Sequence, residues 1–234
     1  MEHVRWILSE LNEGGAHMAH NAMRSSQPRA RRGLAAMLAA RLAGAVLAVA
    51  GLGCAQTLDA YQDQKPEFVL QEFFDGPLIA RGALYDRSGS VIRRFVADIR
   101  GSWEDGEGTL DEIFWWADGE EQTRVWKIGG SDARGFSGTA GDIVGQAVGR
   151  GAGNAFNWAY KLRIALDEDS SIDVRMDDWI YLIDQSTVLN RTKMTWFGIR
   201  VGEVVLTIEK VGEDELYGKS PYPAAPTQSA DSAR

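Results

Sequence analysis

In two long segments in the second half of the chain, apolar residues alternate with residues that are mostly polar. Every second residue from 156 to 166 is apolar, and the same period returns from 172 to 182, with Asp178 as the one polar residue on the apolar face. A period of two is typical of a β-strand that buries one face. The sequence therefore predicts long, half-buried strands that need a shared core.

Shorter alternating segments recur between about residues 78 and 210, separated by short turns rich in Asp, Gly and Ser. Turns this short join neighbouring strands of an antiparallel meander. With about eight to ten strands, closing the sheet removes its exposed edges. The predicted fold is all-β, an antiparallel lipocalin-like up-and-down β-barrel, and a two-sheet sandwich is the alternative.

A short helix is expected just before the strands, because Pro66 and Gly76 bracket an apolar segment. Residues after 212 are rich in Pro, Ala and Ser, which is typical of a mobile tail. The expected organisation is a leader with a signal peptide over 1–53, a lipidated linker over 54–66, the barrel over 67–212 and a disordered tail over 213–234.

The first 54 residues follow the pattern of an export signal. Several arginines precede an apolar run whose uninterrupted part, Leu42 to Gly53, has 12 residues. That length is short of the ~20 residues of a spanning helix but suits a signal peptide. The run ends at Gly53-Cys54, which resembles the processing site of bacterial lipoproteins, so Cys54 is predicted to carry acyl chains.

Three other interpretations of this region stay open. The signal could remain uncut as a membrane anchor, or Cys54 could be a buried core thiol. The true start could also be Met23 or Met37, since residues 1–22 contain three glutamates that signal peptides usually lack.

Every histidine and the only cysteine of the chain lie within these first 54 residues. The rest of the sequence therefore cannot form a His/Cys zinc site, a disulfide framework or a His-dependent nucleophile system. The net charge of −8 makes nucleic acid a poor partner. We expect no cofactor and no enzymatic activity, and a membrane contact through the lipid anchor.

Tryptophans on the strands are candidates for lining a ligand cavity. Trp115, Trp126 and Trp158 are the ones assigned to the interior, where a barrel of this size can hold one small ligand. The neighbours Trp115 and Trp116 must point to opposite faces. Ordinary core packing is the alternative explanation.

Asp178 is the polar candidate of the site, because it shares the inward face of its strand while Asp177 points the other way. A buried carboxylate needs a partner, and Arg163 or Arg191 is expected to supply it. Contact with a ligand hydroxyl is one alternative. Acid catalysis, which would draw also on Asp142, is another.

A dinucleotide-binding loop requires a helix after its glycines within a βαβ unit, but a long alternating strand follows the glycine-rich segment 141–154. This glycine-rich segment is expected to be a mobile loop over the mouth of the barrel. Asn190-Arg191-Thr192 matches a glycosylation sequon, but we expect no glycosylation there because the export signal is of the bacterial type.

Eight short segments, in order along the chain, carry a family resemblance: Phe73-Phe74-Asp75-Gly76, Ala80-Arg81-Gly82, Arg93-Arg94-Phe95, Gly141-Asp142-Ile143-Val144-Gly145, Gly151-Ala152-Gly153-Asn154-Ala155, Asp177-Asp178-Trp179-Ile180-Tyr181, Asn190-Arg191 and Phe197-Gly198-Ile199-Arg200-Val201-Gly202-Glu203. They resemble the domain of unknown function 3833 family of bacterial lipoproteins, over about Tyr61 to Val211.

The resemblance implies an exported lipoprotein without an established reaction or catalytic residues. Genes of this family often lie near those of fatty-acid-modifying enzymes such as cyclopropane-fatty-acid synthases, which implies lipid handling. Ala55 after Cys54 implies sorting to the periplasmic face of the outer membrane.

The leading hypothesis is a lipid-anchored periplasmic barrel that binds a small apolar ligand, such as a fatty acid or lipid-derived metabolite. A scaffold lipoprotein that recruits a protein partner and an acid-dependent enzyme are the two alternatives. A barrel filled solid with side chains would argue against the leading hypothesis.

Overall fold

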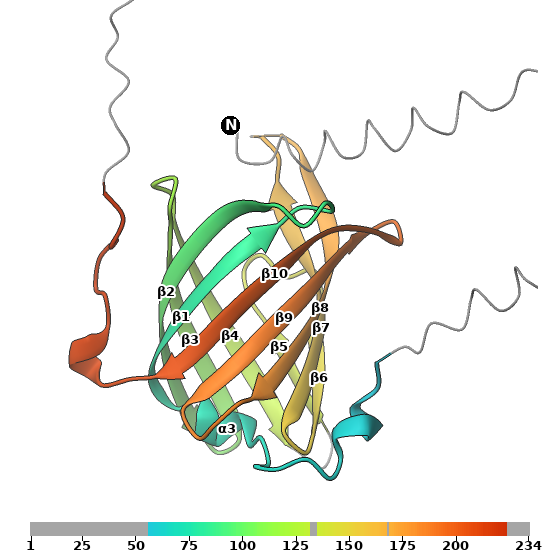
Figure 1. Cartoon of the computed structure of the whole chain (residues 1–234), viewed down its shortest axis with the longest axis vertical. Helices are drawn as coiled ribbons and strands as arrows, with labels where there is room; N and C mark the ends of the chain where they lie inside the picture. The colour runs from blue at the N-terminus through green and yellow to red at the C-terminus, as the bar shows by residue number, and fades with distance from the viewer. Residues whose placement is uncertain (1–55, 132–134, 168, 224–234) are drawn as a thin grey trace, which may run out of the picture. The chain divides into compact units, whose positions relative to one another are not determined.

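Ten antiparallel strands close into one barrel in the computed structural model, which describes residues 56–131, 135–167 and 169–223 (Figure 1). Each strand pairs with its neighbours along the chain, and β1 closes the ring by pairing with β10. The prediction of an all-β up-and-down barrel is confirmed, and the sandwich is not formed. The strands are β1 Gly76–Tyr85, β2 Val91–Glu104, β3 Glu107–Trp116, β4 Glu121–Ser131, β5 Gly135–Thr139, β6 Ala147–Ala152, β7 Ala155–Ala165, β8 Ser171–Leu182, β9 Thr187–Trp196 and β10 Ile199–Lys210.

The alternating pattern of the sequence becomes the inside and the outside of this barrel. On β8, Val174 is fully buried and Met176 and Asp178 are almost so, while their neighbours Asp173 and Arg175 are exposed. Strand β7 pairs with β8 along its whole length and buries Phe156 and Trp158 on the same inner side. The two alternating segments that most constrain the fold are therefore neighbouring strands around one core.

One end of the barrel is closed by α3, Leu70–Phe73, a short helix within the segment from Pro66 to Gly76 where one was expected (Figure 1). The helix packs its apolar side chains on the inner face of the strands, within the same core cluster as Phe68 and Phe74. Lys210 on β10 fixes its C-terminal end, because its ammonium donates to three backbone carbonyls at 2.8 to 2.9 Å. We call this the closed end.

The backbone of the closing segment lies directly against strand β2. A Cβ atom on Gly101 would stand 1.7 Å from the carbonyl oxygen of Phe74, so this contact requires glycine. Trp103 Nε1 donates to the same carbonyl at 3.1 Å. The described chain also enters at this end, where η1, Leu58–Tyr61, contacts β6 and β7.

The barrel wall is incomplete on one side, between β4 and β7. Strand β5 pairs with only the last five residues of β4, 127–131, so among the described residues 121–126 have no strand partner on that side. The connection 140–146 between β5 and β6 runs there along β7, with hydrogen bonds from Val144 N to Lys161 O at 2.9 Å and from Arg163 N to Asp142 O at 2.8 Å. We call this side the seam.

The seam corrects the expectation for the glycine-rich segment 141–154. Its first part is held against β7 by backbone hydrogen bonds, and its second part is strand β6 with a turn. The alternating pattern could not predict this pairing with β7, because glycine has no side chain that is either apolar or polar.

The C-terminal segment corrects the expected tail. Residues 213–223 are described, with η2 at Glu213–Glu215, and they lie on the outside of the barrel. The buried carboxylate of Asp98 on β2 accepts backbone N–H groups of Tyr217 at 2.9 Å and Gly218 at 2.8 Å. Residues 224–234 and the leader 1–53 with Cys54 at its end lie outside the described residues.

Residues 58–223 belong to one compact unit. No helix within the described ranges is long and apolar enough to cross a membrane.

Candidate functional site

The interior of the barrel holds a cavity of about 540 Å³. Leu70 and Phe74 form its floor at the closed end, and most of its walls are aliphatic and aromatic. The cavity reaches solvent beside the seam, at the end of the barrel opposite α3, where the exposed side chains of Glu120 and Arg163 line it; we call this the open end. A concave, mostly apolar space of this size is typical of a site for a small organic ligand.

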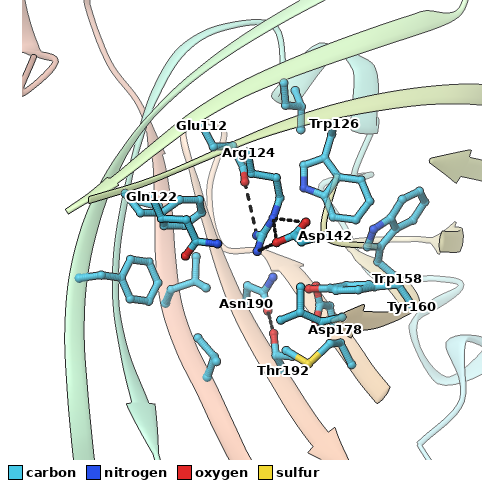
Figure 2. A pocket seen from close by; sticks show the side chains of 18 of the residues that line it. Glu112, Gln122, Arg124, Trp126, Asp142, Trp158, Tyr160, Asp178, Asn190 and Thr192 are labelled. Atoms are coloured by element: carbon cyan, nitrogen blue, oxygen red, sulfur yellow. Dashed lines mark hydrogen bonds and ion pairs between the residues drawn. The ribbon is translucent and has the colours of Figure 1, made fainter. Parts of the chain in front are cut away.

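Charged side chains from three elements meet in this cavity (Figure 2). Glu112 on β3 and Arg124 on β4 are opposite each other in register and both point inward, with Arg124 Nη1 3.6 Å from Glu112 Oε2. Asp142 reaches in from the connection 140–146. Its two carboxylate oxygens accept Arg124 Nε at 3.1 and 3.0 Å and Nη2 at 2.7 Å.

The guanidinium of Arg124 is therefore shared between two carboxylates and stays charged. Burial alone would lower the pKa of Arg124, but the adjacent Glu112 and Asp142 outweigh this and raise it. Burial raises the pKa of Glu112 to about 7 in spite of the opposing effect of Arg124. Glu112 thus titrates near neutral pH, and its Oε2 accepts no hydrogen bond from the described residues.

Asp178 lines the same cavity from β8, opposite Thr192 on β9. Only 6% of the residue is exposed. Burial raises the pKa of Asp178 to about 7, although the neighbouring hydroxyl groups of Thr192 and Tyr160 act in the opposite direction. Its Oδ1 has no hydrogen-bond partner within the part of the chain that the structure describes. An unpaired buried acceptor is costly and therefore marks a place where a ligand or water can bind.

The structure separates the predicted tryptophans. Trp126 and Trp158 line the cavity, and their rings meet edge to face with centroids 5.8 Å apart. Tyr160 adds a third ring, 5.5 Å from Trp126. Trp115 points outward instead, where it is buried beside Tyr217 of the C-terminal segment and donates to Glu121 at 3.0 Å.

The opposite orientation of Trp115 and Trp116 is confirmed, but Trp116 is the one that lines the cavity. The guanidinium of Arg93 lies 3.9 Å from the centroid of the Trp116 ring and also binds Asp118 and Glu120 at the open end. This cluster forms part of the rim.

Neither arginine expected beside Asp178 is there. Arg163 pairs on the outer surface with Asp173, at 2.9 Å, and Arg191 pairs with Glu203. Both arginines occupy outward positions of their strands, whereas the carboxylate of Asp178 points inward, so they lie on the other face of the wall. Asp177 is also outward, and accepts from Asn157 at 2.9 Å.

Sequence reasoning missed Glu112 and Arg124, although a signal was present. Glu112 shares its parity with Leu110 and Phe114, and Arg124 shares its parity with Trp126 and Ile128. Each is thus a charged residue on an otherwise apolar strand face, the same signal that singled out Asp178.

No curated protein matches this chain. A family model, described as "Protein of unknown function (DUF3833)", matches residues 47–210, which include every strand of the barrel and all the charged residues of the cavity. The chain belongs to the DUF3833 family.

Proposed function

We propose that this protein is an exported, lipid-anchored lipoprotein whose barrel binds one small apolar ligand, a fatty acid or a lipid-derived metabolite. The observation that carries the proposal is the cavity of about 540 Å³, walled by apolar side chains and open to solvent beside the seam. Burial of hydrocarbon surface in such a space contributes a favourable free energy of ~25 cal/mol for each Å².

The polar groups of the cavity support a ligand with one polar end. Arg124, Glu112, Asp142 and Asp178 gather in one part of a mostly apolar lining. In an apolar pocket, a small number of polar groups orients the ligand, while the apolar walls supply affinity. The protein then acts as a carrier or sensor and not as a catalyst.

The anchor is the second part of the proposal. A signal sequence that ends at Cys54 would place two or more acyl chains on this residue, enough for stable attachment. The expected location is the periplasmic face of the outer membrane. Replacement of Cys54 by Ser should move the protein from the membrane fraction to the soluble fraction and abolish incorporation of labelled palmitate.

Native mass spectrometry with lipid extraction tests the ligand. The purified protein should carry a lipid of defined mass, close to one per chain. Val204→Trp narrows the cavity and should abolish this mass, whereas Val205→Trp, the next residue on β10 and outside the cavity lining, should leave it. A protein without bound lipid that also ignores added fatty acids and phospholipids would favour the scaffold function instead.

Acid-dependent catalysis is a second candidate, favoured by one observation. Glu112 and Asp178 have pKa values of about 7, near which acid–base catalysts work best. The same mass spectra separate the two functions, since an enzyme would convert its bound lipid with time and a carrier would return it unchanged.

A further inference from the structure

The charge in the interior of the cavity is unbalanced in favour of acids. Three carboxyl groups, those of Glu112, Asp142 and Asp178, face one guanidinium there, that of Arg124, while Arg93, Arg163 and Glu120 line the rim. Inside a cavity of low dielectric such an excess repels anions when the acids are ionised. This imbalance bears on which polar group the proposed ligand can carry.

Arg124 has little capacity left for a ligand carboxylate. Its Nε and Nη2 donate to Asp142, and Nη1 faces Glu112. An incoming anion would have to displace one of these two carboxylates and leave it buried without its cation. The cost of that unpaired buried charge offsets what the new ion pair would return.

Two acceptors in the same cavity accept no hydrogen bond from the described residues: Oδ1 of Asp178, a residue that is 94% buried, and Oε2 of Glu112. Oε2 of Glu112 faces Arg124 Nη1 only at the ion-pair distance of 3.6 Å. Both side chains point into the cavity (Figure 2). The interior thus offers acceptors to a ligand that carries donors, and its guanidinium is already occupied. The two guanidiniums of the rim are paired as well, Arg93 with Asp118 and Glu120 and Arg163 with Asp173.

We infer that the ligand presents a hydrogen-bond donor, a hydroxyl or amino group on a long hydrocarbon chain, to Asp178 and Glu112, and not a free carboxylate. This inference rests on the proposed function and specifies the polar end of the ligand. A metal ion is a poor candidate for the same place, because no group of three or more acidic, His or Cys residues in the described ranges is arranged to hold one.

The protonation of the two acids agrees with a donor ligand. Burial raises the pKa values of Asp178 and Glu112 to about 7, so each group can be present as a carboxylate or as an acid. As a carboxylate it accepts a hydrogen bond from a ligand hydroxyl, and as an acid it can also donate one to the hydroxyl oxygen. An ammonium group would favour the ionised form of both groups and release protons as it binds.

The test compares ligands that differ only in their polar end. Palmitic acid, hexadecan-1-ol and hexadecylamine compete at pH 7.5 for the purified full-length protein against the uncharged fluorescent probe N-phenyl-1-naphthylamine. The alcohol or the amine should displace the probe at about tenfold lower concentration than palmitate, the effect of one good charged hydrogen bond.

Each outcome has a distinct meaning. Equal or tighter binding of palmitate overturns the inference about the polar end and leaves the proposed function intact. Absence of any displacement, together with no bound probe, overturns both. A preference shared by alcohol and amine identifies hydrogen-bond donation as the cause, and a preference for the amine alone identifies its charge.

Two variants locate the effect. Asp178→Asn keeps the shape of the side chain and should remove most of the preference for the amine, while palmitate should bind as well or better. Asp177→Asn, the outward neighbour on the same strand, is the matched control and should change nothing. Because the ligand comparison uses the unaltered protein, the inference can be refuted even if Asp178→Asn does not fold.

Discussion

The guanidinium of Arg124 and the carboxylate of Asp142 join strand β4 to the connection 140–146 across the seam, through three hydrogen bonds of 2.7 to 3.1 Å. The two residues are 18 positions apart, and no pairing of strands brings them together. On this side, their side chains therefore join two neighbouring parts of the wall, which backbone hydrogen bonds between strands join elsewhere in the barrel.

Loss of this pair should destabilise the protein. Arg124→Met leaves Asp142 and Glu112 as mostly buried carboxylates without their cation, and the expected loss in the free energy of unfolding is about 3 kcal/mol. Urea unfolding at pH 8 measures it. Arg163→Met removes a comparable but exposed pair with Asp173 and should cost less than about 1 kcal/mol. Equal losses for the two variants would contradict the role given to Arg124.

Stability should decrease as the pH rises toward neutrality. Glu112 and Asp178 have folded-state pKa values of about 7, above the ordinary carboxyl value of about 4, so between these values the folded protein binds more protons than the unfolded chain. The stabilisation is complete below about pH 4 and is lost as the pH passes through 7. Asp86 and Asp173, whose pKa values are lowered by hydrogen bonds, act with the opposite sign but only at lower pH.

Urea unfolding between pH 5 and pH 8 checks this dependence. Asp178→Asn should flatten the curve and be at least as stable as the unaltered protein at pH 8, where the natural carboxyl is ionised and buried. The pKa of Asp178 also responds to Arg124, Tyr160, Thr192 and Asp177, so the midpoint belongs to the group as a whole. A curve that rises from pH 5 to pH 8 in both proteins would refute the prediction.

Three tryptophans should report a ligand and a fourth should not. A brominated long-chain alcohol in the cavity should quench the emission of Trp116, Trp126 and Trp158, which line it. Replacing all three by Phe should remove most of the quenching. Trp115→Phe should leave it unchanged, because Trp115 lies outside the cavity beside Tyr217.

The C-terminal segment should detach when its carboxylate anchor is removed. Asp98→Asn weakens the two hydrogen bonds from the backbone of Tyr217 and Gly218, so hydrogen exchange of these amides should accelerate by about tenfold or more. Mass spectrometry of the exchanged C-terminal peptide measures the change. Asp111→Asn, at an exposed position of β3, should leave the exchange as it is.

The strand pattern could be predicted from the sequence because one face of nearly every strand is buried. Asp178 was recognised as inward for this reason, since it interrupts an apolar row on β8. The same parity argument places Arg163 on the outer face of β7. The expectation that it would reach Asp178 came from charge alone and disregarded the pleat.

Other features depend on information that the alternating pattern does not contain. Trp115 and Trp116 are both large and apolar, so parity separates their faces but does not decide which is inside. The meeting of Glu112 with Arg124 depends on the register of β3 and β4, and that of Arg124 with Asp142 depends on a connection outside the strands. Tyr217 is held by a carboxylate more than a hundred residues away.

The seam gives the barrel two mechanical regimes. Near the closed end the wall is a complete ring, which resists widening because every strand is bonded on both sides. Toward the open end it is a split ring, whose edges are β4 on one side and the connection 140–146 against β7 on the other. A split ring can spread by bending, at the cost of the Arg124 contact rather than of a strand ladder. We therefore expect the hydrocarbon chain of the proposed ligand to enter sideways through this part of the wall rather than from the tip.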